Sequence, residues 1–359
     1  MEKIKKAIYC AIRMSICNFR CSYCYLSQRE SCFEGRQIEW KYSPEYIQKA
    51  FSRKRLGGIC YFNLCADGET LLVKDFPLYV KAILSEGHFV EIITNASLSL
   101  KLNELLSTLN EDELSRTSFK CSLHYLELKK RNLLESFAQN VNCIWNAGAS
   151  ATIEIVGSDI YLPFIEEIKK YCKENFGALP HVTIARDDND GRKLLTNMSE
   201  DEYYKVWSGF DSPFFDYKRT IFGVKRNEFC YAGMWSLYVD MNTGESTQCY
   251  ISNFAQNIYE NVDKPIKWKP ICKCNDHHCY NGHSFLCVGL IPSLNSPSYG
   301  TTMRNRLNTK TNKNWYTDRA LSFFDSKLSE SNKEISPISK CYFRILNKTK
   351  RILNKVTKK

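Results

Sequence analysis

Six short apolar segments alternate with amphipathic segments over the first 190 residues, and this alternation limits the fold more than any other feature. The predicted strands are residues 7–12, 59–65, 90–94, 118–123, 150–156 and 181–185. Strands separated by helices form a parallel sheet with right-handed crossovers. We therefore expect an α/β fold whose sheet is either open or closed into a barrel.

The segments between these strands carry helix signals. Ser43 is a good N-cap and Pro44 suits the first helical position, and glycines at 87, 148 and 177 follow candidate helix ends. The predicted helices are residues 44–51, 76–86, 102–109, 128–147 and 162–175.

A cysteine-rich loop follows the first predicted strand. Cys17, Cys21 and Cys24 have the spacing C-x3-C-x2-C, and Tyr23 precedes the last of them. Iron–sulfur clusters usually take four thiolates, so three would leave one iron open to a small molecule. Half of a zinc site and a disulfide cluster are the alternatives, but Cys32 alone supplies no second pair. The loop also lies at the carboxyl end of a strand, where barrels of this type place their chemistry.

This pattern resembles the signature of the radical S-adenosylmethionine (SAM) enzymes. The resemblance implies a partial (β/α)6 barrel, open on one side. It also implies a [4Fe–4S] cluster at Cys17, Cys21 and Cys24, whose open iron is chelated by SAM. One electron from that cluster would cleave SAM to a 5′-deoxyadenosyl radical, which abstracts hydrogen from a substrate.

Later strand ends agree with this resemblance. Gly68 and Glu69 match the family's Gly-Gly-Glu-Pro segment, whose acid binds the SAM amino group, while the differing Asp67 is given no role. Asn95 lies in a segment similar to the family's Thr-Asn-Gly, and Ser122 in one similar to Ser-x-His. With Tyr23, these residues would shape the SAM pocket.

Two further residues keep two interpretations. His124 is either part of the SAM pocket or a hydrogen-bonded core histidine. Alternation would place Glu154 on the barrel interior, to contact SAM or substrate, and the alternative is a solvated acid at a strand end.

A second group of cysteines lies between residues 230 and 287. Cys230 and Cys249 flank a segment with alternating apolar residues and an Asn-Thr-Gly turn at 242–244, which predicts a β-hairpin. The pattern resembles the SPASM or shorter twitch extension of radical SAM enzymes, which holds auxiliary clusters. Six cysteines suffice for one further [4Fe–4S] cluster but not two.

We expect Cys230 and Cys249 as ligands of that cluster, completed by two of Cys272, Cys274 and Cys279. Our choice is Cys274 and Cys279, with Cys287 in the core. Structural zinc is the alternative, because three histidines at positions 277, 278 and 283 lie in the same segment.

Composition places the chain among soluble globular proteins, with 43% hydrophobic and 25% charged residues. The sequence shows neither a signal peptide nor an apolar stretch of the ~20 residues that span a bilayer. We expect a cytoplasmic protein with reduced thiols. Six cysteines are predicted to be core residues, namely Cys10, Cys60, Cys65, Cys121, Cys143 and Cys172.

The chain divides into three predicted parts: a radical SAM core at 1–215, an auxiliary-cluster domain at 216–295 and a helical tail at 296–359. Residues 340–359 are expected to form a basic amphipathic helix suited to a membrane surface or a partner. The alternative is a frayed, solvated terminus. The body is close to neutral without that segment, which argues against nucleic acid.

The sequence thus predicts a radical SAM enzyme with a second [4Fe–4S] cluster. A small molecule or carbohydrate is the expected substrate, with a peptide as the alternative, and flavodoxin or ferredoxin would be the electron donor. A non-catalytic iron–sulfur carrier and a zinc-binding interaction protein are the competing functions.

Overall fold

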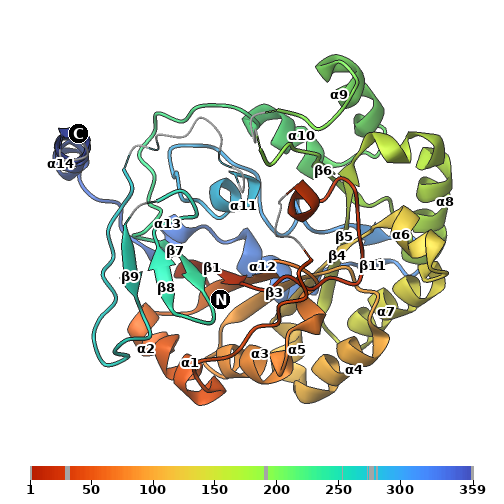
Figure 1. The fold of residues 1–359 in the computed structure, drawn as a ribbon, viewed down its shortest axis with the longest axis horizontal. Helices are drawn as coiled ribbons and strands as arrows, with labels where there is room; N and C mark the ends of the chain where they lie inside the picture. The colour runs from red at the N-terminus through yellow and green to blue at the C-terminus, as the bar shows by residue number, and fades with distance from the viewer. Residues whose placement is uncertain are drawn as a thin grey trace.

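A nine-stranded sheet is the frame of the protein in this computed structural model (Figure 1). The structure describes residues 2–28, 33–189, 193–252, 254–272, 274, 279 and 282–356. The strand order is β6-β5-β4-β3-β2-β1-β7-β8-β9, and every neighbouring pair from β6 to β7 is parallel. The α/β class and the partial barrel predicted from the sequence are confirmed.

The strands of the large sheet are β1 Lys6–Ile12, β2 Cys60–Ala66, β3 Phe89–Thr94, β4 Thr117–Ser122, β5 Ser150–Gly157, β6 His181–Ile184, β7 Ser236–Asp240, β8 Glu245–Thr247 and β9 Ala255–Asn257. The first six match the six predicted strands to within one residue at either end. They form as predicted because their apolar residues are buried on both faces, as in parallel sheets generally.

The helices around the barrel are α1 Pro44–Ala50, α2 Arg53–Leu56, α3 Phe76–Leu84, α4 Ser99–Thr108, α5 Glu111–Ser115, α6 Tyr125–Lys130, α7 Leu134–Asn146, α8 Ile165–Phe176, α9 Glu200–Ser208 and α10 Pro213–Ile221. Three 3-10 helices accompany them, η1 Tyr25–Gln28, η2 Thr70–Leu72 and η3 Asp159–Phe164. The single helix predicted at 128–147 is wrong. The chain turns at Asn132, which has a positive φ of 56°, and this turn separates α6 from α7.

The predicted hairpin exists, but it continues the barrel sheet. Strand β7 pairs with β8 in antiparallel fashion and with β1 in parallel fashion, so the second cysteine segment begins beside the strand that carries the first. The predicted boundary at 215/216 falls within α10. The division into domains therefore stays a prediction.

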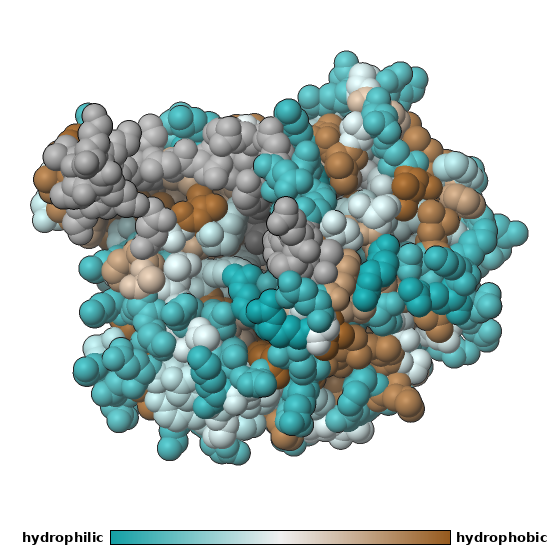
Figure 2. Space-filling model, viewed as in Figure 1, coloured by the Kyte–Doolittle hydropathy of each residue, from teal (hydrophilic) through white to brown (hydrophobic). Residues whose placement is uncertain are grey.

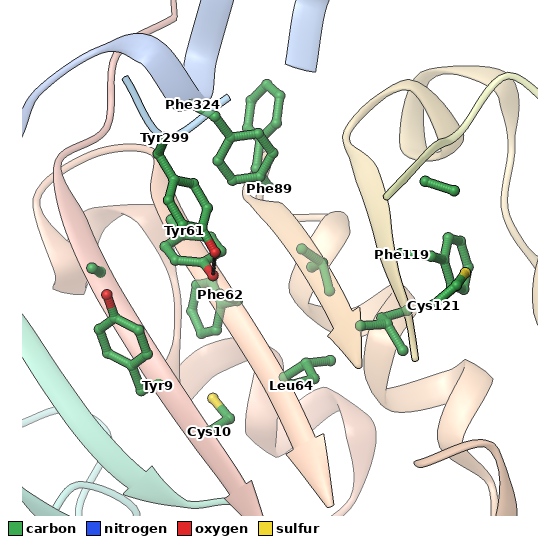
Figure 3. Close-up of a cluster of buried hydrophobic side chains, with 14 of the residues drawn as sticks. Tyr9, Cys10, Tyr61, Phe62, Leu64, Phe89, Phe119, Cys121, Tyr299 and Phe324 are labelled. Carbon is green, nitrogen blue, oxygen red and sulfur yellow. Dashed lines mark hydrogen bonds between the residues drawn. The ribbon is translucent and has the colours of Figure 1, made fainter. Parts of the chain in front are cut away.

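The C-terminal part contains α11 Gly282–Cys287, the small pair β10 Leu307–Asn308 and β11 Lys313–Asn314, and the helices α12 Asp318–Asp325, α13 Leu328–Ser331 and α14 Pro337–Val356. The residues before and within α12 return to the barrel. Tyr299 and Phe324 pack against Tyr61 of β2, and the hydroxyls of Tyr299 and Tyr61 are 3.2 Å apart (Figure 3). The tail thus completes the barrel core.

Helix α14 extends away from the body at the C-terminal end (Figure 1). It exposes Ile338, Tyr342 and Ile345, while Asn347 donates a 2.8 Å hydrogen bond to the carbonyl of Ile271. The amphipathic helix predicted for the tail is confirmed as a helix. In the described residues, none of the helices is both long and apolar enough to cross a membrane.

The predicted core cysteines agree with the structure in most positions. Cys10, Cys60, Cys121, Cys172 and also Cys287 are buried, and Cys65 is half-buried. The prediction for Cys143 is wrong, because its side chain is exposed on α7.

Candidate active site

The cysteine loop and the carboxyl ends of the strands open onto one cavity of about 620 Å³. That volume is within the range of small-molecule sites, roughly 300–1,000 Å³. The cavity is lined by the three loop cysteines and by every other predicted SAM-pocket residue, namely Cys17, Cys21, Cys24, Tyr23, Gly68, Glu69, Asn95 and Ser122. The structure therefore brings the whole predicted first site together.

Burial dominates the electrostatics of the cysteine loop. It raises the pKa of Cys17 to about 11 and that of Cys21 to about 12, and nearby Cys24 adds to both shifts. These thiols are therefore neutral at pH 7 in the chain alone. A bound metal would displace their protons.

Tyr23 fixes the loop to the barrel wall. Its hydroxyl lies 2.6 Å from Nδ1 of His124 and 2.6 Å from the hydroxyl of Tyr161. Burial lowers the pKa of His124 to about 4, so its ring is neutral. His124 is thus both a buried, hydrogen-bonded histidine and a residue of the cavity wall, and the structure supports parts of both interpretations.

Gly68 and Glu69 lie where the second strand meets the cysteine loop. The amide of Glu69 donates to the carbonyl of Ile16 at 3.0 Å. A Cβ added at Gly68 would stand 2.0 Å from that carbonyl oxygen, which no real side chain tolerates. Only glycine allows this close approach, so the loop is held against the backbone after β2.

The Glu69 carboxylate is buried and receives three donors. It accepts hydrogen bonds from Thr94 Oγ1 at 2.5 Å, from the Asn95 amide at 2.7 Å and from the Leu71 amide at 3.0 Å. Burial raises its pKa above the ordinary value, against the effect of these bonds. A carboxylate offers about four acceptor positions, so one remains for a ligand.

Asn18 is a site residue that the sequence analysis missed. Its side chain accepts a 2.8 Å hydrogen bond from Asn95 Nδ2 and donates one of 2.8 Å to Ser97 Oγ. These bonds tie the cysteine loop to the end of β3. Its place inside the cysteine motif, directly after Cys17, was its only signal in the sequence.

Asp67 has a structural explanation. Arg13 Nη1 donates to its carboxylate at 2.8 Å, and the same guanidinium lies 3.9 Å from Asp240 of β7. The pair joins β1, β2 and β7 at their carboxyl ends. This agrees with giving Asp67 no role in SAM binding.

A network of buried charges forms the other wall of the cavity. Glu154 pairs with Lys120 at 2.8 Å and with Arg304, and Arg304 also lies 3.3 Å from Glu91. Tyr299 donates to Glu91 at 2.9 Å. Glu154 therefore faces the barrel interior and is not a solvated acid. Arg304 and Tyr299 come from the tail, far away in sequence, and sequence reasoning could not place them.

The second cysteine group also assembles. Burial raises the pKa of Cys230, Cys249 and Cys279 to about 12 each, and Cys274 adds to all three shifts through its proximity. Cys272 is fully buried and its backbone pairs with Cys230. The four preferred thiols thus lie near one another, and Cys272 lies near Cys230 as well.

Within the described residues, no three His, Cys, Asp or Glu side chains are grouped closely enough to hold a metal ion. A cubane cluster attaches its thiolates to separate irons, so it requires a wider arrangement than a single ion. His277 and His278, and the side chain of His283, lie outside the described part.

Comparison with known proteins agrees with this geometry. Residues 12–120 match the sequence model of the Radical SAM superfamily. In these residues the chain is similar to the radical SAM domain. The domain supports an enzyme, and this superfamily uses a [4Fe–4S] cluster and SAM. The matched residues contain the cysteine loop, Gly68, Glu69 and Asn95. A search of curated proteins finds no match.

Solved structures with a similar fold include radical SAM enzymes. The structure of Streptococcus suis SuiB aligns with a TM-score of 0.50 at 14% identity over 74% of this chain. This chain spans 66% of the SuiB chain, just under two thirds of its length. Native anSMEcpe with bound AdoMet aligns with a TM-score of 0.48 at 15% identity, over 71% of this chain and 78% of that one. BtrN in complex with AdoMet and 2-DOIA aligns over 92% of both chains, at 14% identity and a TM-score of 0.36.

The residues present fit the superfamily's cofactors. Three thiols of one loop face the cavity, Gly68 permits the close backbone approach, and Glu69 keeps an acceptor for an ammonium group. Burial strengthens such a charge-assisted contact.

Proposed function

We propose that this chain is a radical SAM enzyme that cleaves SAM reductively and abstracts hydrogen from a substrate bound in the same cavity. The observation that carries the proposal is the convergence of Cys17, Cys21, Cys24 and Glu69 on that cavity. When bound, the [4Fe–4S] cluster would supply the electron that breaks the S–C5′ bond of SAM, which gives methionine and a 5′-deoxyadenosyl radical.

The chain's own residues would bind and orient the reactants. Glu69 accepts a hydrogen bond from the SAM amino group, and Gly68 keeps the adjacent backbone close to the cysteine loop. Asn95 and Ser122 supply polar groups at the ends of β3 and β4, and Tyr23 holds the loop. The buried walls exclude water, which protects a reactive intermediate.

We propose that Cys230, Cys249, Cys274 and Cys279 hold a second [4Fe–4S] cluster. Tyr250 supports this assignment, because its ring lines the cavity while its hydroxyl donates to Cys279 Sγ at 3.6 Å. This contact joins the second cysteine group to the cavity. A cluster at that position is suited to exchanging an electron with the substrate or to anchoring it.

The substrate that we propose is a small molecule or a carbohydrate. The cavity is enclosed by charged and hydroxyl groups from β3, β4, β5 and the tail, which suits a compact polar ligand. A peptide is the alternative. SuiB has been solved bound to precursor peptide SuiA, and anSMEcpe with a bound Cp18Cys peptide.

Three further assignments belong to the same proposal. Flavodoxin or ferredoxin would supply the electron. A cytoplasmic location suits a chain with 17 cysteines, because thiols stay reduced there. Helix α14, with its exposed apolar residues and basic composition, would contact an anionic membrane surface. The face in Figure 2 is otherwise largely hydrophilic, with apolar residues in scattered groups. Co-sedimentation with lipid vesicles tests the α14 assignment. We expect the protein to sediment with anionic but not with neutral vesicles, and deletion of residues 337–359 should abolish this binding.

Metal analysis of anaerobically purified and reconstituted protein tests the two-cluster proposal. About eight irons per chain supports two [4Fe–4S] clusters. About four irons with one zinc would instead support one cluster and a structural zinc site. Protein without iron would contradict the proposed function as a whole.

A further inference from the structure

Lys218 is a buried lysine in the cavity wall to which the mechanism above gives no role. It lies on α10, and its Nζ donates a 2.9 Å hydrogen bond to Thr183 Oγ1 of β6. Both residues line the cavity. Within the described part of the chain, Lys218 forms no ion pair with a carboxylate.

The other cations of the cavity differ from Lys218 in this respect. Lys120 pairs with Glu154 at 2.8 Å, and Arg304 pairs with both Glu154 and Glu91. Arg13 pairs with Asp67 at 2.8 Å. Arg186 lies 3.6 Å from Asp188, which also lines the cavity. These acids of the cavity wall are therefore paired with other cations, and Lys218 has no acidic partner among the described residues.

The surroundings of Lys218 are themselves positive. Burial lowers its pKa well below the ordinary value, and the nearby charges of Arg186 and Lys120 lower it further. A buried charge is costly unless it is paired. An anion entering this end of the cavity would supply the missing partner of Lys218. Arg186 and Lys120 contribute positive charge nearby, although Arg186 also pairs with Asp188 and Lys120 with Glu154.

SAM cannot be that anion if its amino group binds at Glu69. Thr183 lies on β6 and Glu69 follows β2, so four strand intervals separate them in the sheet. At 4.7–4.9 Å per interval this is roughly 19 Å along the sheet. The single carboxylate of SAM is bonded to the same carbon as its amino group, so it stays near Glu69. The anion must belong to a second molecule.

We propose that Lys218 and Thr183, with Arg186 beside them, form a subsite that binds an anionic group of the substrate, a carboxylate or a phosphate. This inference rests on the proposed function and makes it more specific: the substrate is a small molecule that carries an acidic group. The anionic group anchors one end of the substrate at β6, while its reacting carbon extends toward the cysteine loop.

The test measures anion binding to reconstituted enzyme with SAM bound. Succinate and inorganic phosphate are titrated separately, with ligand-detected NMR as the readout, and the tighter of the two identifies the acidic group. We expect binding to wild-type enzyme and a loss of about tenfold or more in Lys218→Met. Lys218→Arg keeps the charge and retains binding. Lys205→Met removes an exposed lysine of α9 and serves as the matched control.

Equal anion affinities in wild-type enzyme and Lys218→Met, or no binding of either anion to wild type, would overturn the proposal. SAM affinity and uncoupled 5′-deoxyadenosine formation are measured on the same samples and should be unchanged. If wild-type enzyme lacks SAM cleavage, the proposed function fails, and the anion titration still reports on the subsite separately. If Lys218→Met does not fold, Thr183→Val takes its place and should weaken anion binding.

Discussion

Replacing Glu69 by glutamine tests directly whether this carboxylate binds SAM. Glutamine keeps the size of the side chain and one acceptor oxygen. That oxygen can still accept from Leu71 and Thr94, which both donate to Oε1 in the wild type. The new NH₂ group then faces the Asn95 amide, which donates to Oε2 in the wild type. The variant thus loses one hydrogen bond and the negative charge.

The lost hydrogen bond lowers the free energy of unfolding, and the lost charge weakens SAM binding. Leaving the buried Asn95 amide without an acceptor costs about 1–3 kcal/mol of stability. Losing the carboxylate partner of an ammonium group costs about 2–5 kcal/mol of binding free energy, which is a factor of about 30 to 4,000 in affinity. We expect a loss within this range for both Glu69→Gln and Glu69→Ala, because the acceptor position left for the ammonium is on Oε2. Glutamine has an NH₂ donor at that position, and alanine has no polar group there.

Isothermal titration of SAM into anaerobically reconstituted protein measures this loss, and iron content shows whether the cluster is intact. Glu113→Gln is the matched control, because Glu113 is also buried but caps α5 through the Asn110 amide at 2.9 Å and does not line the cavity. It should lower stability and leave SAM affinity unchanged. Wild-type SAM affinity in Glu69→Gln and Glu69→Ala, with full iron content, would refute the role given to Glu69.

Two further predictions concern the second cysteine group and a buried histidine. The double variant Cys230→Ala/Cys249→Ala should lose about half of its iron. It should keep uncoupled SAM cleavage, because the Cys17–Cys24 loop does not include these cysteines. Unchanged iron with loss of zinc would contradict the second cluster. His88 is buried, accepts from the Cys60 amide and contacts the Phe51 carbonyl, and burial lowers its pKa to about 4. Between about pH 6.5 and pH 4 the unfolded chain therefore binds a proton that the folded chain does not, and stability falls on acidification by up to about 1.4 kcal/mol per pH unit. Denaturant unfolding at about pH 7 and about pH 5 should show wild type losing about 2 kcal/mol more than His88→Gln; equal losses would show that His88 does not titrate in this way.

The barrel and the first site could be predicted because their signals are local. Each inner strand is a short apolar run, and parallel sheets bury such runs on both faces. The carboxyl ends of parallel strands meet at one edge, so motif segments after β1, β2, β3 and β4 had to converge. Gly68 and Glu69 could be located for this reason, although the segment departs from its family pattern at Asp67.

The network of buried charges in the cavity wall opposite the cysteine loop could not be predicted, because the residues that pair in it are distant in sequence. Glu154 was placed on the interior by alternation, but Arg304 and Tyr299, which complete its network, lie about 150 residues away in an irregular segment of the tail. The sequence did not indicate that Lys218 lines the cavity, because a lysine on an amphipathic helix usually faces solvent. The pairing of β7 with β1 could not be predicted either, because the sequence of a strand does not show which other strand it will pair with.

The central claim is that the Cys17–Cys24 loop supports reductive cleavage of SAM. The most direct measurement is 5′-deoxyadenosine formed from SAM by anaerobically reconstituted enzyme with dithionite as reductant. The account predicts 5′-deoxyadenosine from the wild type and none above background from Cys17→Ala, Cys21→Ala or Cys24→Ala, while each variant still folds. 5′-Deoxyadenosine formation by all three variants at the wild-type level would contradict the assignment, as would its absence from a wild-type enzyme that holds its full complement of iron.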